Sequence, residues 1–409
     1  MSASKPVHVL DGYKVLDFTQ ALAGPTVTRL MAELGAEVIK IEIPPKGDFS
    51  RALPFLKDGR SAYFVQQNRG KKSLCIDPKK PDGLAIIKRL LPEVDVLVEN
   101  YSPGAIGRMG LGWDAVHAIN PRLIMCSVSA FGQTGPLANR PGYDYIGMSY
   151  AGVTYMIGDP NGPPSFPMLG LGDVSTGVHA LAAIACALLH RDRSGTGQHL
   201  DISLVDSYFH CHELNVQMYS ASGGKVKPRR PGLHHTSAPI IGIFRGKAPD
   251  SYFFIMAPVD HQFAELCRTM GRPELATDPR FSTVVARAVN LAEITGVIQS
   301  WLDAQPDDAT ILRTLEEHRI PVAPILSIEE AVNHPHLRQR RTVRKIRDRF
   351  IGEYDIPGVP LRFSDFPEEL DLQAPLLGEH NAEILKRLGY SEKQLGELQQ
   401  AGVITSGPR

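Results

Sequence analysis

The first third of the chain alternates short apolar runs with helical patterns, and this alternation constrains the fold more than any other feature. Strands are predicted for the runs at residues 14–19, 37–42, 95–99 and 123–130. Helices are predicted between them, at residues 26–34, 83–91 and 113–119. Continuous apolar strands separated by helices are typical of a parallel sheet that is covered on both faces. We therefore predict an α/β fold with a doubly wound, mostly parallel sheet.

The chain length predicts more than one domain, because 409 residues exceed what a single hydrophobic core usually serves. A segment rich in glycine, proline and basic residues, 222–232, marks a boundary. Beyond it the sequence carries its own strand and several amphipathic helices. We predict that residues 1–222 form the N-terminal part of a large α/β domain, that 223–330 form a smaller α+β domain, and that 331–409 form a connector and C-terminal part.

The composition argues against several classes of protein. Lysine plus arginine equals aspartate plus glutamate, at 44 each, so no excess of positive charge favours a nucleic-acid partner. The five cysteines are scattered without a C-x-x-C pair, which fits a reducing compartment. The N-terminus lacks the pattern of a signal peptide, and the apolar run 178–189 is too short to span a membrane. We predict a cytoplasmic protein without a membrane partner.

The sequence lacks the common motifs of nucleotide and hydrolase chemistry. There is no G-x-G-x-x-G after the first strand, no G-x-x-x-x-G-K-[ST], and no G-x-S-x-G. His210, Cys211 and His212 are adjacent, and adjacent side chains do not readily face one ion. We predict no metal site.

The segment LGDVSTG, residues 171–177, places Asp173 among glycines just before an apolar helix. An aspartate in this position is typical of a helix N-cap. A carboxylate at a helix N-terminus also fits covalent chemistry, because spare N–H groups there stabilise developing negative charge. The residues alone leave both interpretations open.

Seven segments in order resemble the class III CoA-transferase family, which includes formyl-CoA transferase, carnitine CoA-transferase and α-methylacyl-CoA racemase. They are LDFTQALAGP (16–25), GAEVIKIE (35–42), DVLVENYSPGAIGRMG (95–110), NPRLIMCSVSAFGQTGP (120–136), PGYD (141–144), LGDVSTG (171–177) and PLLGEHNAEILKRLG (375–389). The resemblance covers nearly the whole chain. It implies two interlocked, ring-like chains in a homodimer, with the C-terminal part returning to the large domain.

The resemblance also implies a reaction. Acyl-CoA and a small carboxylic acid would be the substrates, and no cofactor would stay permanently bound. Asp173 matches the family's nucleophile, which forms an aspartyl anhydride and then an aspartyl-CoA thioester. We expect an ordinary aspartate pKa of about 4, so that the carboxylate is ionised near neutrality. We also expect Gly170 and Gly172 to leave room for the approaching thioester.

Further residues match the family's coenzyme A contacts. Lys79 and Arg108 are expected on the phosphate or adenine side, where solvated surface cations are the alternative. Ile43 stands where formyl-CoA transferase has a basic residue, so the adenine contacts are less defined. The remaining expected CoA-binding residues are Ala23, Ile76, Asn100, Tyr101 and Met109.

Two alternatives to acyl-CoA:carboxylate transfer are a racemase or epimerase of the same family and a catalytically silent CoA-binding protein. Racemases carry Gly-His-Asp, and a histidine exchanges an α-proton near neutral pH. Here Gly142 is followed by Tyr143, whose pKa near 10 suits that exchange poorly. Tyr143 therefore favours a transferase, in which it orients the substrate; simple packing is the alternative role. Retention of Asp173 argues against the silent protein.

The acceptor acid is expected to be larger or less polar than formate or oxalate. Leu22 stands where formyl-CoA transferase has a glutamine, and the flexible polyglycine loop of that enzyme has no counterpart here. Dicarboxylates, carnitine-like acids and aryl acids are the candidates. His235, next to His234, is predicted to orient the acceptor carboxylate, with an ordinary polar loop residue as the alternative.

Overall fold

The computed structural model describes residues 6–407, which form two compact units. The first unit holds the chain up to Val153, the segment Met168–Leu214 and the chain from Pro335 onward. The second unit holds Thr154–Pro167 and Asn215–His334. The boundaries predicted after residues 222 and 330 stay a prediction.

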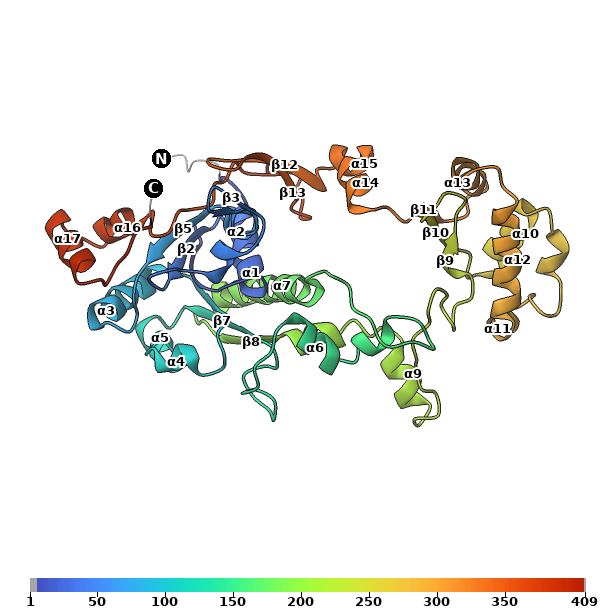
Figure 1. The fold of residues 1–409 in the computed structure, drawn as a ribbon. Helices are drawn as coiled ribbons and strands as arrows, with labels where there is room; N and C mark the ends of the chain where they lie inside the picture. Colours follow the sequence, from blue (N-terminus) through green and yellow to red (C-terminus); the bar gives the residue numbers. More distant parts are fainter. Residues whose placement is uncertain (1–5, 408–409) are drawn as a thin grey trace. The chain divides into compact units, whose positions relative to one another are not determined.

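The first unit is built on a six-stranded sheet in which all neighbouring strands are parallel. The strands are β1 (Lys14–Phe18), β2 (Glu37–Glu42), β5 (Lys71–Cys75), β6 (Val96–Glu99), β7 (Ile124–Ser129) and β8 (His199–Ser203). Their order is β5-β2-β1-β6-β7-β8, so the connections run outward in both directions from the β1/β6 pair. Figure 1 shows β5 and β2 on one side of this sheet and β7 and β8 on the other. The predicted doubly wound α/β fold is confirmed.

Two hydrophobic cores cover the two faces of this sheet, because the apolar strand residues alternate between the faces. On one face Val15 and Val98 pack with the helices α1 (Ala23–Glu33) and α7 (Leu171–Ser194). On the other face Leu16 and Leu97 pack with helices from both ends of the chain. Those helices are α3 (Pro81–Leu90), α4 (Ala105–Arg108), α5 (Trp113–Ile119), α16 (Asn381–Arg387) and α17 (Glu392–Gln400).

Shorter elements complete the first unit. Its other helices are α2 (Ala62–Asn68), α6 (Asp144–Tyr150), α8 (Leu204–Phe209), α15 (Pro335–Gln339) and the 3₁₀ turns η1 (Phe49–Ala52) and η2 (Leu91–Glu93). Its hairpins pair β3 (Leu56–Lys57) with β4 (Arg60–Ser61) and β12 (Val343–Asp348) with β13 (Gly352–Pro357). The β12–β13 hairpin packs its apolar residues against Phe64 and Val65 of α2.

Helix α7 extends beyond both ends of the apolar run 178–189. By length and apolar composition alone it is the one helix in residues 6–407 that meets the criterion for crossing a membrane. Core helices of soluble proteins meet the same criterion, and α7 buries Ala180, Ile184 and Leu188 in the core beside α1 and the sheet.

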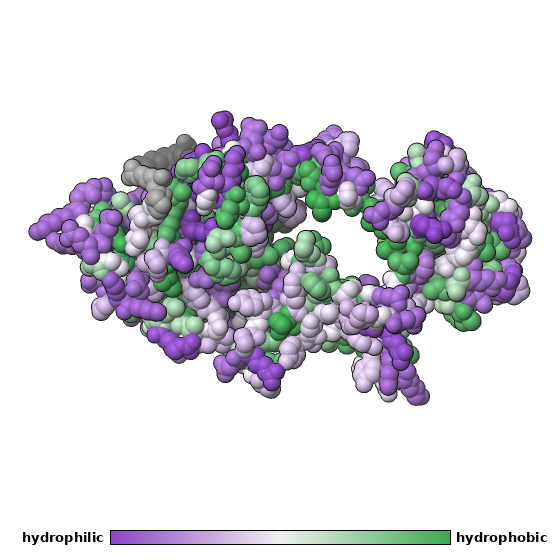
Figure 2. Space-filling view, in the orientation of Figure 1, coloured by the Kyte–Doolittle hydropathy of each residue, from purple (hydrophilic) through white to green (hydrophobic). Residues whose placement is uncertain are grey.

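The second unit has an antiparallel sheet in the order β11-β10-β9, formed by β9 (Ile241–Arg245), β10 (Tyr252–Met256) and β11 (Val322–Pro324). Its helical segments are η3 (Thr154–Met156), α9 (Asn215–Ala221), α10 (Asp260–Thr269), η4 (Pro273–Ala276), α11 (Val284–Val289), α12 (Leu291–Asp303), α13 (Asp308–Glu317) and α14 (Ile328–Asn333). Phe253 and Ile255 face a core with α10, α12 and α13. The opposite side of β10 leaves Tyr252, Phe254 and Met256 partly exposed, and apolar residues show at the surface of this unit (Figure 2).

Candidate active site

The candidate site lies where the connections of the sheet reverse direction. β1 and β6 are neighbours, but the chain leaves β1 toward β2 and leaves β6 toward β7. The loops after these two strands therefore diverge, and open α/β sheets bind ligands in the crevice that results. A cavity of about 340 Å³ opens there. Its lining residues are Gln20, Ala21, Leu22, Ala23, Phe49, Asn100, Tyr101, Ser102, Pro103, Val128, Ser129, Ala130, Ala138, Arg140, Pro141, Gly142, Tyr143, Asp173 and Leu204.

Asp173 lines this cavity as the third residue of α7. The residue before the helix is Gly170, which provides no side-chain cap, so Asp173 is not the N-cap that the sequence left open. The backbone N–H of Asp173 donates to the Asp144 carboxylate, with 3.0 Å between Asp173 N and Asp144 Oδ2. A carboxylate from another helix thus satisfies a donor in the first turn of α7.

The pKa of Asp173 is raised to about 7, first by burial and second by the negative charge of Asp144. The expectation of an ordinary pKa near 4 is therefore wrong. A helix N-terminus favours the ionised form, but desolvation beside a second carboxylate outweighs it here. Within residues 6–407, neither acid has an ion pair with a lysine or arginine.

Tyr208 fixes the position of Asp144. The buried Asp144 begins α6, and the Tyr208 hydroxyl donates a hydrogen bond to Asp144 Oδ1. Burial and the Asp144 carboxylate raise the pKa of Tyr208 well above its usual value, which keeps the hydroxyl protonated as a donor.

The glycines around Asp173 provide space for protein side chains. A Cβ on Gly172 would lie 2.1 Å from Cε2 of Tyr208, and a Cβ on Gly170 would lie 2.5 Å from Cδ2 of Leu22. Both distances are far below a normal contact. The prediction that these glycines leave room for the thioester is therefore wrong, because the space beside them is already occupied by Tyr208 and Leu22.

Besides Tyr208, two further tyrosines belong to the surroundings of Asp173. Tyr143 lines the cavity and is 76% exposed, so its hydroxyl is accessible to a bound molecule. Tyr63 of α2 has a pKa raised to about 12 by burial and by the charges of Asp173 and Asp48. Sequence reasoning missed Tyr63, because nothing in its local pattern distinguishes it from a helix residue that packs in the core.

The structure separates the predicted CoA contacts into two groups. Ala23, Asn100 and Tyr101 line the cavity with Leu22 and Asp173. The others lie outside the lining of the cavity: Lys79 and Arg108 are exposed, Ile76 is buried and Met109 packs on the core. All four follow the carboxyl ends of β5 or β6, so they belong to the same edge of the parallel sheet as the cavity.

His235 lies in the second unit, in the loop before β9. Its Nδ1 accepts hydrogen bonds from the backbone N–H groups of Ser237 (3.1 Å) and Ala238 (2.9 Å). The ring therefore stabilises its own loop, and its predicted role toward the acceptor acid stays a prediction.

No metal cluster is found in the part of the chain that the structure describes. Residues 6–407 contain no group of three or more His, Cys, Asp or Glu side chains that could hold an ion. The adjacent His210, Cys211 and His212 diverge: His210 contacts the ring of His179, Cys211 donates to a backbone carbonyl, and His212 contacts the carbonyl of Ala151.

Comparisons with known proteins give matches over nearly the whole chain. The profile described as CoA-transferase family III matches residues 10–381. The succinyl-CoA–D-citramalate CoA-transferase of Chloroflexus aurantiacus is 37% identical over 407 residues, covering 99% of this chain and 100% of the relative. The succinyl-CoA:glutarate CoA-transferase of Homo sapiens is 34% identical over 401 residues, covering 97% and 90%. A crystal structure of a CAIB/BAIF family protein from Brucella suis matches with a TM-score of 0.80 and 34% identity, covering 93% of this chain and 99% of that chain.

Proposed function

This chain belongs to CoA-transferase family III, and from that premise we propose that it moves coenzyme A from an acyl-CoA donor to a free carboxylic acid through covalent intermediates on Asp173. The observation that carries the proposal is the position of Asp173 in the lining of the cavity at the β1/β6 switch point. Its carboxylate has no ion pair with a lysine or arginine among residues 6–407. Covalent catalysis divides one difficult exchange into easier steps.

In the first half of the reaction, a carboxylate oxygen of Asp173 attacks the thioester carbonyl of the donor. The carbon–sulfur bond breaks, CoA leaves as a thiolate and a mixed anhydride forms. The thiolate then attacks the aspartyl carbonyl of the anhydride, which releases the donor acid and leaves an aspartyl-CoA thioester. The acceptor carboxylate attacks that thioester, and the same steps in reverse release the new acyl-CoA and the Asp173 carboxylate.

The environment of Asp173 favours its acylation. Burial and the Asp144 charge destabilise the ionised carboxylate, which is why its pKa is raised to about 7. The anhydride and the thioester carry no charge on the Asp173 side chain, so forming them relieves this penalty. A more basic carboxylate is also a better nucleophile once it is ionised.

We propose succinyl-CoA as the donor and a dicarboxylic acid as the acceptor. Two relatives are named for transfer from succinyl-CoA to citramalate or glutarate. Arg140 is the one lysine or arginine among the residues that line the cavity, and it has no ion pair with a carboxylate in residues 6–407. A guanidinium pairs readily with a second carboxylate of a substrate.

The matched test of this substrate class is Arg140→Ala assayed with a dicarboxylic and a monocarboxylic acceptor. We expect KM for glutarate to rise about 10-fold or more, with little change for a monocarboxylic acid of similar size. Equal changes for both acceptors would remove Arg140 from carboxylate recognition.

The reaction class is tested by incubating the protein with succinyl-CoA and a panel of free acids and following new CoA thioesters by mass spectrometry. Transfer of CoA to a second acid is expected. Exchange of the α-proton in a 2-methylacyl-CoA without any acyl exchange would instead establish a racemase, and CoA binding without either reaction would establish a silent binding protein.

We also propose that the chain acts as a cytoplasmic homodimer. Its large exposed apolar side chains support an interface: Leu171, Val174, Val178 and Leu189 lie along α7, and Tyr252 is one of several on β10. The five cysteines are all free, which fits a reducing compartment. Light scattering at micromolar concentration tests the dimer, and a monomer mass would contradict it.

A further inference from the structure

The loop between β1 and α1 forms a wall of the candidate active site with an unusual backbone. Gln20, Ala21 and Leu22 line the same cavity as Asp173. Ala21 has a φ of +63°, in the left-handed region that costs free energy for any residue with a Cβ. Leu22 lies against Gly170, the residue that precedes the Asp173 helix. The geometry of this loop therefore sets the space beside the nucleophile.

Side chains from neighbouring strands and loops bind the backbone of this loop along its length. The Thr19 N–H donates to Asp17 Oδ1 at 2.8 Å, and the Thr19 carbonyl accepts from Lys40 Nζ at 2.6 Å. Asn100 binds both backbone groups of Gln20. Its Oδ1 accepts from the Gln20 N–H at 2.8 Å, and its Nδ2 donates to the Gln20 carbonyl at 2.9 Å. An irregular loop needs such partners, because buried backbone groups without a hydrogen bond are costly.

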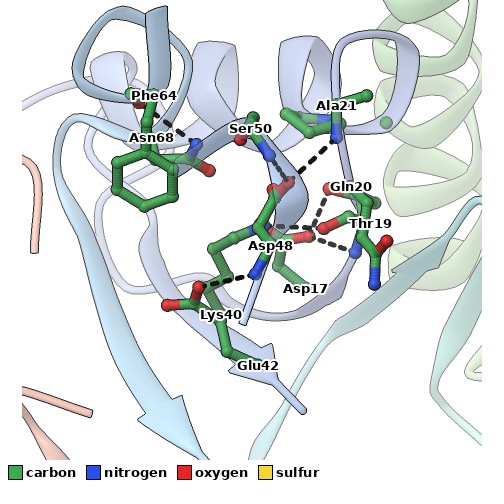
Figure 3. A network of polar contacts seen from close by, with 12 residues as sticks. Asp17, Thr19, Gln20, Ala21, Lys40, Glu42, Asp48, Ser50, Phe64 and Asn68 are labelled. Carbon is green, nitrogen blue, oxygen red and sulfur yellow. Dashed lines mark hydrogen bonds and ion pairs between the residues drawn. The ribbon is translucent and has the colours of Figure 1, made fainter. Parts of the chain in front are cut away.

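Asp48 connects this loop to a second wall of the cavity (Figure 3). Its Oδ1 accepts from the N–H of Ala21 at 3.3 Å and from the N–H of Ser50 at 2.9 Å. The second contact caps η1, whose first residue, Phe49, lines the cavity. The other oxygen, Oδ2, lies 2.9 Å from Lys40 Nζ, with both side chains almost fully buried. One carboxylate thus fixes Ala21 and η1 together.

A second buried ion pair accompanies the pair of Asp48 and Lys40. Lys71 Nζ lies 3.0 Å from Asp17 Oδ2, and both side chains are fully buried. Burial acts to raise the pKa of Asp48, but Lys40 and the donors of Ser50 hold it below the usual range. A buried ion pair of this kind is weak evidence for net stability, but removing one partner leaves an uncompensated buried charge.

We propose that Asp48, held by Lys40, is a positioning residue of the transferase: it keeps Ala21 in the left-handed conformation and so sets the cavity wall that faces Asp173. The kinetic part of this inference rests on the proposed function. Asp48 is not itself in the lining of the cavity, so its influence on the reaction passes through Ala21 and Phe49.

A double-mutant cycle between Asp48→Asn and Ala21→Gly tests this role. Glycine adopts a positive φ without the Cβ penalty, so a glycine at position 21 needs Asp48 less than the native alanine does. With Ala21 in place we expect Asp48→Asn to lower kcat/KM about 30-fold, mostly through kcat. In the Ala21→Gly background we expect the same substitution to cost no more than about 5-fold. Equal losses in both backgrounds would overturn the proposal.

Asp48→Ser and Asp250→Gly provide the second variant and the matched control. A serine at position 48 still caps a helix turn but loses the charge toward Lys40, so it should behave like Asp48→Asn. Asp250 also has a positive φ, of +59°, and lies in the second unit. Asp250→Gly relieves backbone strain in the other unit and should not rescue Asp48→Asn. Rescue equal to that by Ala21→Gly would show general stabilisation instead of positioning.

Hydrogen exchange gives a readout that does not depend on activity. Mass spectrometry of peptides that span residues 17–26 should show that Asp48→Asn accelerates exchange at the Ala21 amide about 10-fold or more, while peptides of the second unit stay unchanged. Unchanged exchange at Ala21 would overturn the proposal even if activity falls. A wild-type protein that transfers no CoA would refute the proposed function, while the exchange result would still decide whether Asp48 holds the loop.

Discussion

Two groups of buried acids lie at the same edge of the central sheet, and they differ in their partners. Asp17 and Asp48 are paired with Lys71 and Lys40, at 3.0 Å and 2.9 Å. Burial acts to raise the pKa of both acids, but the lysines bring it below the usual range. Asp173 instead lies beside another acid, and its pKa is raised to about 7.

The difference separates acids that hold the structure from an acid that is available for chemistry. A carboxylate that is paired and fully hydrogen-bonded is a poor nucleophile, because the lysine stabilises the charge that an attack would consume. A carboxylate whose ionised form is destabilised by burial is relieved of that penalty when acylation removes its charge. Perturbed acids in a cavity are for this reason candidates for function.

Replacing Asp173 should have the largest effect on activity. Asp173→Asn removes the proposed nucleophile, and kcat/KM for CoA transfer should fall by about 10⁴-fold or more. Calorimetry should show that the affinity for CoA changes by no more than about threefold, because non-covalent binding of CoA does not require the Asp173 carboxylate. Asp192→Asn, an exposed acid on the same helix, is the matched control and should keep full activity.

Removing a lysine from the paired group should have the largest effect on stability. Lys40→Met leaves the Asp48 carboxylate buried without its cation, and we expect the free energy of unfolding to fall by about 3–5 kcal/mol. Chemical denaturation measures this change. A loss below about 1 kcal/mol would mean that Lys40 does not stabilise the Asp48 carboxylate as their ion-pair distance indicates.

We expect Asp173→Asn to stabilise the protein at alkaline pH. The folded pKa of about 7 lies above the unfolded value of 3.8, so ionisation between these values favours the unfolded chain. At pH 8 the variant should be about 1–3 kcal/mol more stable than the wild type, less than the full shift implies because the site is partly solvated. The difference should shrink toward pH 4, where the folded carboxyl is protonated. Equal stabilities at pH 8 would contradict a raised pKa.

Replacing Asp144, the acid beside Asp173, should have a smaller effect. The initial rate should rise with pH through about 7 in the wild type, because only the ionised Asp173 attacks. Asp144→Asn removes one cause of the raised pKa, so the midpoint of the kcat/KM profile should move about one unit lower. Tyr208→Phe removes a hydrogen bond but keeps the Asp144 charge, and its midpoint should not fall. A midpoint that stays the same in Asp144→Asn would leave burial as the only cause.

The sequence predicted the fold class because apolar strands and helices alternate with a clear period. The β5 strand, KKSLC, escaped prediction because two lysines open it; Lys71 is fully buried through its pairing with Asp17, a contact that no local pattern reveals. The basic composition of residues 338–349 predicts a solvated segment, yet Arg344 is buried against Glu33, which is 311 positions away in the chain.

The candidate site was predictable only in part. The resemblance to the family's motifs led to four residues that line the cavity: Leu22, Asn100, Tyr101 and Asp173. The pKa of Asp173 is raised by burial and by the charge of Asp144. Both arise only when the chain folds. Side chains from distant segments fill the space beside Gly170 and Gly172. The two glycines therefore indicated that space is needed there, but not which group occupies it.

The most direct test of the central claim is to trap the acylated carboxylate. The protein is incubated with succinyl-CoA, treated with hydroxylamine, digested and analysed by peptide mass spectrometry. We predict a hydroxamate on Asp173 that requires acyl-CoA and is absent from Asp173→Asn, with Asp17, Asp48 and Asp144 unmodified. Full CoA transfer by Asp173→Asn, or a hydroxamate on another carboxylate while Asp173 stays unmodified, would contradict the account.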